Sequence, residues 1–339
     1  MVLCLVPYFL SFPQKPSRKQ VNTRNYCRRP AFRSACVFRP QILPSTNTEA
    51  NGLRVFIVSD LHTDYPENMT WVRDLSKKRF EHVFYVPGNH DLWCRREDHS
   101  YFDSFEKLDK LLDACQKIGV ETKPVILDVL GIIPLFSWYH ESFDKELDIP
   151  GFRIPSLEMA CKDFRACKWA NDENSLALFF DVMNDKNNDL VEEIKSKCSQ
   201  IISFSHFLPR QELCPEKRML FYPKLPKVIG SDFLESRIRS IHGNKGAASA
   251  CHVFGHTHFC WDALLDGIRY VQAPLAYPRE RKRRMNGGED WLPFCIYYDS
   301  KFAERLSPCY WSDYYSQNAR TPDITQLAPW VSRFYTRLS

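Results

Sequence analysis

The chain has 339 residues, of which 44% are hydrophobic and 14% aromatic, and its formal net charge is +5. A chain of this size can bury one sizeable core, so one large domain with appendages accounts for its length. Eight of the 46 basic residues but only one of the 41 acidic residues lie in the first fifty, so the remainder is close to neutral. Net charge therefore gives no argument for binding nucleic acid or a membrane surface.

Residues 1–50 are rich in Arg, Ser, Asn and Pro and contain no acid before Glu49. They show no sustained helical or strand periodicity, so the composition predicts a targeting or disordered segment that is removed after import. We expect the chloroplast as destination, with the mitochondrion and the cytoplasm as alternatives. The apolar start, Met1 to Phe12, also fits a secretory signal, but no basic residue precedes it.

The 13 cysteines include no C-x-x-C pair. This pattern disfavours both a structural zinc site and a disulfide framework. No apolar run approaches the roughly 20 residues that a membrane-spanning helix needs. The sequence therefore predicts no membrane span.

The first predicted elements alternate between strand and helix. Leu53–Ser59 is a compact, β-branched run that predicts a buried strand ending on Asp60. Residues 67–80 have helical character. Val83–Pro87 predicts a second strand, which ends at Gly88-Asn89-His90-Asp91.

The middle of the chain continues with helices and a hairpin. Apolar residues at helical spacing predict a helix over 101–118, stopped by Gly119. Residues 125–137 resemble a hairpin that turns near Leu130-Gly131. Two further helices are predicted over 176–183 and 189–197.

Two more strands end in histidines. Gln200–Ser205 precedes His206, and Cys251–Phe254 precedes Gly255-His256-Thr257-His258. A helix is expected between them over 232–242, and further strands over 263–272 and 293–298. The pattern is that of an α/β fold. Polar clusters at the carboxyl ends of its strands mark the place where ligand sites form in such sheets.

These clusters contain the side chains that divalent ions bind. Asp60 and His62 are two residues apart on one exit turn and can reach one metal, and His256 and His258 can serve one metal or two. The amide oxygen of Asn89 is a further candidate ligand.

The residues after Asn89 suggest proton transfer. His90 is a candidate acid, and Asp91 is a candidate to orient its imidazole.

In this order and spacing, the motifs D-x-H, G-N-H-D, a lone strand-end His and G-H-x-H resemble the calcineurin-like metallophosphoesterases, from about Arg54 to Tyr298. The resemblance implies a four-layer sandwich of two mixed β-sheets flanked by helices. It places the domain at residues 51–305, followed by a C-terminal extension over 306–339.

The resemblance also implies a binuclear centre of manganese, iron or zinc ions that cleaves a phosphoester substrate. One ion would be held by Asp60, His62 and His258, and the other by Asn89, His206 and His256. His90, with Asp91 as its partner, would then protonate the leaving oxygen or stabilise the transition state.

One motif of that family is absent. G-D-x-x-D, whose first Asp joins the two metals, is expected between His62 and Gly88, where the chain has no Gly and only Asp64 and Asp74 as aspartates. Three interpretations follow. A strand and a helix between Asp64 and Phe80 are missing from this form of the chain, Asp64 replaces the ligand, or the site holds one metal.

The alternative to a phosphoester hydrolase is therefore a catalytically impaired isoform or a non-catalytic interaction protein on the same scaffold. Arg210 and Arg279 are candidates to contact substrate phosphate. The basic run 279–284 is expected to be a solvated loop, in preference to a nucleic-acid contact.

Overall fold

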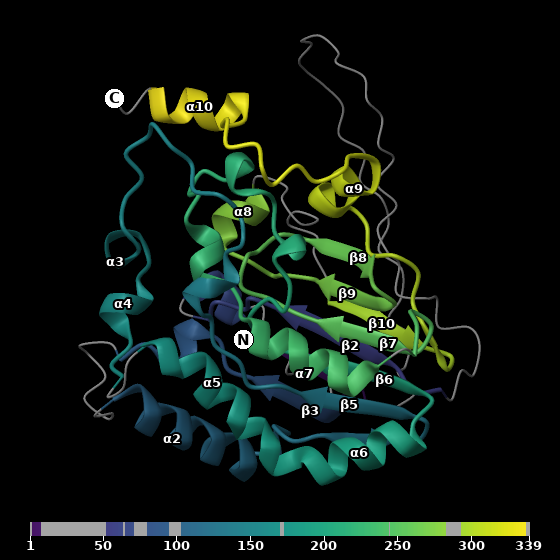
Figure 1. Ribbon diagram of the computed structural model, residues 1–339. Helices are drawn as coiled ribbons and strands as arrows, with labels where there is room; N and C mark the ends of the chain where they lie inside the picture. Colours follow the sequence, from purple (N-terminus) through teal and green to yellow (C-terminus); the bar gives the residue numbers. More distant parts are fainter. Residues whose placement is uncertain are drawn as a thin grey trace, which may run out of the picture.

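The computed structural model of the protein describes residues 2–7, 52–63, 65–70, 80–94, 103–169, 173–243, 245–282 and 293–336. In this part of the chain two β-sheets lie face to face, and helices cover the outer face of one of them (Figure 1). The α/β class predicted from the sequence is therefore confirmed.

The five-stranded sheet, sheet A, has the strand order β11-β10-β2-β1-β3. Every neighbouring pair in it is antiparallel. Its strands are β1 (Val2–Pro7), β2 (Val55–Ser59), β3 (Phe80–Val86), β10 (Phe294–Tyr298) and β11 (Lys301–Phe302).

The six-stranded sheet, sheet B, has the order β4-β5-β6-β7-β9-β8 and is mixed. Strands β5, β6, β7 and β9 run parallel, while β4 and β8 are antiparallel edge strands. Its strands are β4 (Val125–Leu127), β5 (Leu130–Pro134), β6 (Gln200–Phe204), β7 (Ala250–Val253), β8 (Trp261–Leu265) and β9 (Ile268–Gln272).

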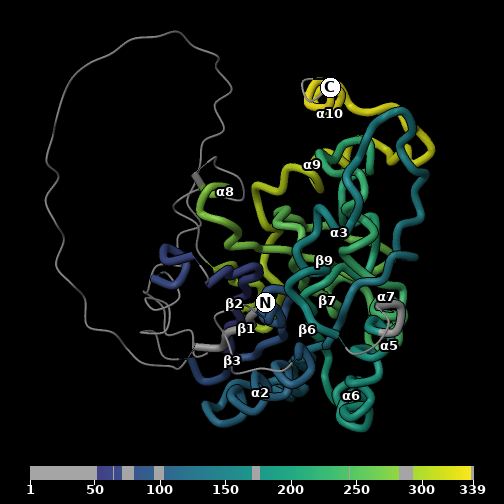
Figure 2. The backbone as a smooth tube through the Cα atoms, turned by 90° about the vertical axis from the view of Figure 1, so that its left-hand side faces the viewer, coloured from purple at the N-terminus to yellow at the C-terminus, as the bar shows by residue number. Residues whose placement is uncertain are grey.

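The helices complete the layers. Figure 2 shows sheet B between sheet A and helices α5 to α7. The α-helices are α2 (Ser104–Lys117), α3 (Leu157–Ala160), α4 (Asp163–Ala166), α5 (Glu173–Met183), α6 (Asn188–Lys197), α7 (Asp232–His242), α8 (Pro278–Lys282), α9 (Tyr310–Gln317) and α10 (Pro329–Thr336). Short 3-10 turns are η1 (Asn89–Leu92), η2 (Glu141–Phe143), η3 (Asn184–Asn187), η4 (Gln211–Leu213), η5 (Lys217–Met219) and η6 (Leu225–Val228).

Strand β6 shows why the two sheets stack. Ile202 and Phe204 face the core between the sheets, whereas Ile201 packs with Ile238 and Ile241 of α7 on the other face. All four parallel strands of sheet B carry buried apolar residues on both faces, as strands between two layers do. The carboxyl ends of β6 and β7 are thereby fixed on a rigid support.

Strand β1 lies between β2 and β3. Val2 pairs with Ser59 on one side and with Val86 on the other, so β1 runs opposite to both strands and separates them by one strand. The first residues of the expected targeting segment therefore complete sheet A, while residues 8–51 lie outside the described chain. Removal of residues 1–50 after import stays a prediction.

The position of β1 bears on the absent motif. Its sequence, VLCLVP, contains no carboxylate, so this strand brings no acidic ligand between β2 and β3. Residues 66–70 are helical, as expected for the start of the 67–80 helix. Asp64 and Asp74 lie outside the described residues, so Asp64 as a substitute ligand stays a prediction.

Two turns differ from the sequence expectations. The predicted strand over 263–272 is a hairpin of β8 and β9, turned at Asp266-Gly267, where both residues have positive φ (46° and 84°). Asp-Gly is the residue pair that a two-residue hairpin of this kind favours. The first hairpin turns at Asp128-Val129 and not at Leu130-Gly131, because Gly131 lies within β5, where a Cβ would meet Ile194.

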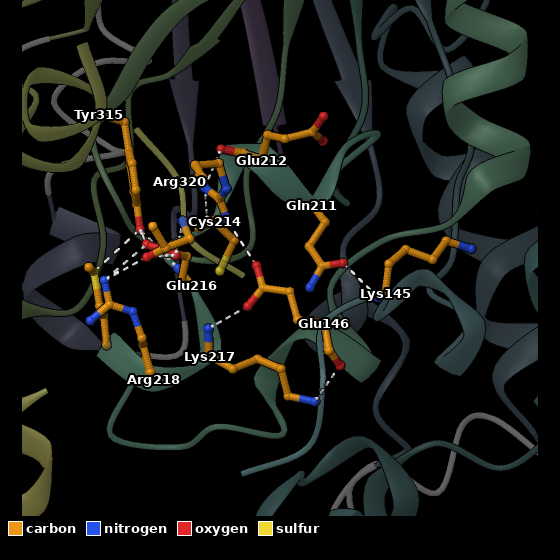
Figure 3. Close-up of polar contacts among 12 residues, drawn as sticks. Lys145, Glu146, Gln211, Glu212, Cys214, Glu216, Lys217, Arg218, Tyr315 and Arg320 are labelled. Carbon is orange, nitrogen blue, oxygen red and sulfur yellow. Dashed lines mark hydrogen bonds and ion pairs between the residues drawn. The ribbon is translucent and has the colours of Figure 1, made fainter. Parts of the chain in front are cut away.

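The C-terminal extension packs on the domain through buried polar contacts (Figure 3). Arg320 donates to Glu146 Oε1 (3.0 Å) and to the carbonyl of Cys214 (2.9 Å), and Tyr315 donates to Glu216 Oε2 (3.0 Å). Lys217 is only 2% exposed and binds Asp144 and Asp148. These contacts fix the loop after β6, which carries one wall of the cavity described next.

No helix in the described residues is long and apolar enough to cross a membrane.

Candidate metal centre

The four predicted motifs meet in one cavity of about 390 Å³ at the carboxyl ends of β2, β3, β6 and β7. Ser59 at the end of β2 bonds with the 273–275 segment after β9 (Ser59 N to Ala273 O, 3.1 Å), so the two sheets are tied together at this edge. The sequence-predicted residues on the cavity wall are Asp60, His62, Asn89, His90, Asp91, His206, His256 and His258.

Asp60, His62 and His258 form the first ligand group. One candidate ligand atom from each lies within 4.8 Å of the other two, as a shared metal ion requires. The Nε2 atoms of His62 and His258 are 2.7 Å apart. Two ring nitrogens that point at each other across such a short gap are arranged to share a cation.

Asn89, His206 and His256 form the second ligand group. His206 Nε2 lies 3.1 Å from Asn89 Oδ1 and 3.2 Å from His256 Nδ1. All three side chains are at least half-buried, and Asn89 and His206 are almost fully so. Asp60 Oδ1 is 4.0 Å from His206 Nδ1, so the two groups are adjacent.

Four of these residues have a left-handed backbone. The φ angles are 54° at Asp60, 43° at His62, 77° at His256 and 59° at His258. Residues other than glycine adopt this region at a cost of about 1 to 3 kcal/mol each, and such strain concentrates at functional sites. In both the D-x-H and the H-x-H motif, the first and the third residue have this left-handed backbone.

Neighbouring groups fix the orientation of the candidate ligands. Asp60 accepts from His256 N (2.7 Å), from Ser59 Oγ (2.7 Å) and from Gln272 Nε2 (3.2 Å). The carboxylate is thus anchored by three donors.

The tautomers of two imidazoles follow from their partners. His258 Nδ1 lies 3.0 Å from Glu280 Oε2, and His256 Nε2 lies 3.0 Å from the carbonyl of Val228. These oxygens accept, so each of these nitrogens carries the proton. The lone pairs are left on His258 Nε2 and His256 Nδ1, which face the other ligands.

Burial keeps most of the cluster neutral. Loss of hydration, together with neighbouring imidazoles, lowers the pKa of His62, His90 and His206. Burial likewise lowers the pKa of His256 to about 4, against the charges of Asp163 and Asp60. Burial acts on His258 too, but the hydrogen bond to Glu280 and the charge of Asp60 raise its pKa. Neutral imidazole is the form that binds metal.

His90 lies against an aromatic platform. Its ring stacks on Trp93 with centroids 3.6 Å apart and meets His62 edge-on at 4.6 Å. The predicted partner Asp91 accepts from Gly88 N (2.8 Å), and among the described residues the Nδ1 of His90 has no hydrogen-bond partner. The Trp93 ring supports one face of His90, and Asp91 Oδ2 closes the turn after β3. Asp91 as the partner of His90 stays a prediction.

The two arginines predicted to contact phosphate have different surroundings. Arg210 does not line the cavity, and its guanidinium binds Glu212 and Asp266 at 2.5 Å each. Arg279 is exposed beside the cavity, 5.3 Å from the ring of the lining residue Tyr277. The expectation for Arg210 is corrected, since its charge is neutralised by neighbouring carboxylates.

The basic run after β9 begins as a helix. Arg281 in α8 donates to the carbonyls of Leu275 and Ala276 and to Asn68 Oδ1 (2.6 Å). It therefore holds the turn beside Asp60 in place. The solvated loop predicted for 279–284 is corrected over Arg279–Lys282, and residues 283–292 lie outside the described chain.

Several residues in the cavity wall or directly behind it were missed by sequence reasoning. Asp163 is 3% exposed and contacts Asn89, Lys162 lies 4.3 Å over the Trp93 ring, and Glu280 binds His258. None of them follows a strand or belongs to a short motif. The acidic residue Glu280, inside an otherwise basic run, was the one local signal.

The donor set fits divalent metal ions. A carboxylate, an amide oxygen and neutral imidazole nitrogens converge, which suits manganese, iron or zinc. The Nε2 atom of His62, which lies 2.7 Å from His258 Nε2, is the ring nitrogen that belongs to this donor set.

Known proteins give a distant match. No family model matches the chain. It is 27% identical over 288 residues to the [acyl-carrier-protein] phosphodiesterase PptH of Mycobacterium tuberculosis, covering 80% of this chain and 82% of that protein. It is 21% identical over 210 residues to an uncharacterized protein of Acanthamoeba polyphaga mimivirus, covering 60% and 70%.

The crystal structure of phosphopantetheinyl hydrolase PptH from Mycobacterium tuberculosis superposes with a TM-score of 0.48 at 22% identity, over 75% of this chain and 84% of that one. The sequence match identifies the chain as a distant homologue of a phosphodiesterase, a hydrolase of phosphoester bonds.

Proposed function

We propose that the protein is a metal-dependent hydrolase of phosphodiesters. One observation carries this proposal: two ligand groups, Asp60/His62/His258 and Asn89/His206/His256, meet in one cavity that His90 also lines. The homology to a phosphodiesterase supports the same class of reaction.

The residues of the cavity have separate tasks. Divalent ions held by the two groups would polarise the phosphoryl oxygens and lower the pKa of the attacking water. His90, stacked on Trp93, would stabilise the charge that develops on the leaving oxygen by donating a hydrogen bond from its ring N–H. Arg279 at the cavity edge attracts the anionic substrate.

The proposed substrate is the diester that joins a phosphopantetheine arm to a carrier protein. The support is the name of the mycobacterial relative and the match over 82% of its length.

The test is incubation of the full chain with Mn²⁺ and a purified phosphopantetheinylated carrier protein, followed by mass spectrometry of the carrier. We expect the carrier to lose the mass of its arm. The His90→Ala and His256→Gln variants should lose this activity, and Arg269→Lys, far from the cavity, should keep it. An unchanged carrier, together with no hydrolysis of a generic aryl phosphodiester, would falsify the proposal.

The second candidate function is a non-catalytic scaffold of the same fold. The absence of a carboxylate from β1, between the two ligand-bearing strands, favours it. On this alternative the protein binds metal and does not hydrolyse either substrate.

A further inference from the structure

Asp163, at the first position of α4, is a buried carboxylate in the cavity wall. It is 3% exposed. Asn89 Nδ2 donates to both of its oxygens, at 2.9 and 3.1 Å, and Trp93 Nε1 donates to Oδ1 at 2.6 Å. Cys161 Sγ is 3.5 Å from Oδ2. Its partners are thus two residues of the motif after β3 and one neighbour on its own loop.

This carboxylate determines which way the Asn89 amide points. An amide can be turned so that either its oxygen or its amino group faces the cavity. An ionised carboxylate only accepts hydrogen bonds, so the amino group of Asn89 must face Asp163. The amide oxygen is thereby turned toward His206 Nε2, at 3.1 Å, which is the orientation a ligand needs.

The same carboxylate also fixes the indole beneath His90. Trp93 donates to Asp163 Oδ1, and the His90 ring stacks on that indole with centroids 3.6 Å apart. One side chain at the start of α4 therefore contacts both a candidate metal ligand, Asn89, and the indole on which His90 stacks. The sequence gap between Asp163 and Asn89 is 74 residues, so this contact depends on the tertiary fold.

We propose that Asp163 is the positioning residue of the second ligand group, holding the Asn89 oxygen toward the metal and the Trp93 indole under His90. This inference rests on the proposed function only in assuming that the second group binds a divalent ion. Metal-binding measurements test it without reference to any substrate.

The test is a reciprocal exchange. In Asp163→Asn, one oxygen remains to accept from both Asn89 Nδ2 and Trp93 Nε1, and the new amino group lies against the amino group of Asn89, so the Asn89 amide is no longer held in a single orientation. In the double variant Asp163→Asn/Asn89→Asp, the new amide donates to the new carboxylate, whose other oxygen faces the metal, and an oxygen remains for Trp93. Asn89→Asp alone sets two carboxylates against each other.

Binding of Mn²⁺ to the full chain is measured by calorimetry and by metal content after gel filtration, with circular dichroism and Tm for each variant. We expect Asp163→Asn to lower the affinity for the second Mn²⁺ ion by about 10- to 100-fold. The affinity for the first Mn²⁺ ion should stay within about twofold. The double variant should recover most of this loss. Asp262→Asn is the matched control, because Asp262 is 4% exposed, binds Arg269 and does not line the cavity.

The control should lower the Tm and leave both Mn²⁺ equivalents unchanged. A purely structural Asp163 would lower the Tm of its variant without a selective loss of one equivalent, and that result overturns the inference. A double variant that binds no better than Asp163→Asn, although folded, overturns it too. Normal metal binding with no hydrolysis of any diester would overturn the proposed function and leave this inference standing.

Discussion

Two ligand groups share the cavity, and they are built differently. The first contains its own carboxylate, Asp60, with three hydrogen-bond donors around it. The second consists of Asn89, His206 and His256 and carries no charge of its own. Its nearest carboxylate behind the ligands, Asp163, comes from the short helix α4, outside the strand-end motifs.

This difference in charge predicts the order in which the two groups bind metal ions. A dication gains most from an anionic ligand, so the first group should fill before the second. The second group depends on a neutral amide that must be turned correctly from behind. Substitutions in the two groups should therefore separate the two metal equivalents.

The largest effect is expected for Asp60→Asn. It removes the charge of the first group and leaves His256 N and Ser59 Oγ facing an amide, at a cost of about 3 kcal/mol or more, roughly a hundredfold in affinity. Titration with Mn²⁺ should lose the tight equivalent, and hydrolysis should fall to background. If tight Mn²⁺ binding is retained, the first group is not the one that fills first.

His256→Gln should remove the weaker equivalent alone. Its Nδ1 faces His206, and its Nε2 binds the carbonyl of Val228, so the change leaves the first group intact. Metal content should fall from two ions to one per chain. Simultaneous loss of both ions would instead mean that the two groups act as one site.

A smaller effect is expected for Glu280→Gln. The carboxylate fixes the proton of His258 on Nδ1, and the loss of such a partner lowers metal affinity by about tenfold or somewhat more. The change should affect the first equivalent only. An equal loss at both equivalents would contradict the separation of the groups.

The smallest effect is expected for Arg210→Met, because Arg210 lies outside both ligand groups. Its partners Glu212 and Asp266 are 42% and 62% exposed, so the ion pairs contribute about 1 kcal/mol or less. Metal binding and kcat/KM should stay within about twofold of the unchanged chain. A large rise in KM would instead support the contact between Arg210 and substrate phosphate that the sequence predicts.

Much of this site follows from local sequence. The strands ending on Asp60 and His206 are apolar, β-branched runs, and their position in the sheets is set by burial on both faces, so strand-end residues had to converge. The order of the motifs then indicated which side chains would share the cavity.

The remainder depends on tertiary contacts that no local pattern encodes. Asp163 and Glu280 reach the ligands from a short helix each, and neither helix has an amphipathic period long enough to read. Arg210 was misjudged because its nearness to His206 in sequence says nothing of Asp266, 56 residues away. Strand β1 was missed because the composition around it predicts a targeting segment.

Strand β1 links the start of the chain to the order in which the protein can fold. Residues 2–7 precede both of their partners in the chain, yet they pair with residues 55–59 and 80–86, so both partners must be present before the strand has a place. Proteolytic removal of the first fifty residues would leave β2 and β3 with facing unpaired edges, which are templates for a strand of another chain. A form of the chain without residues 1–50 would therefore need a strand from elsewhere to complete sheet A.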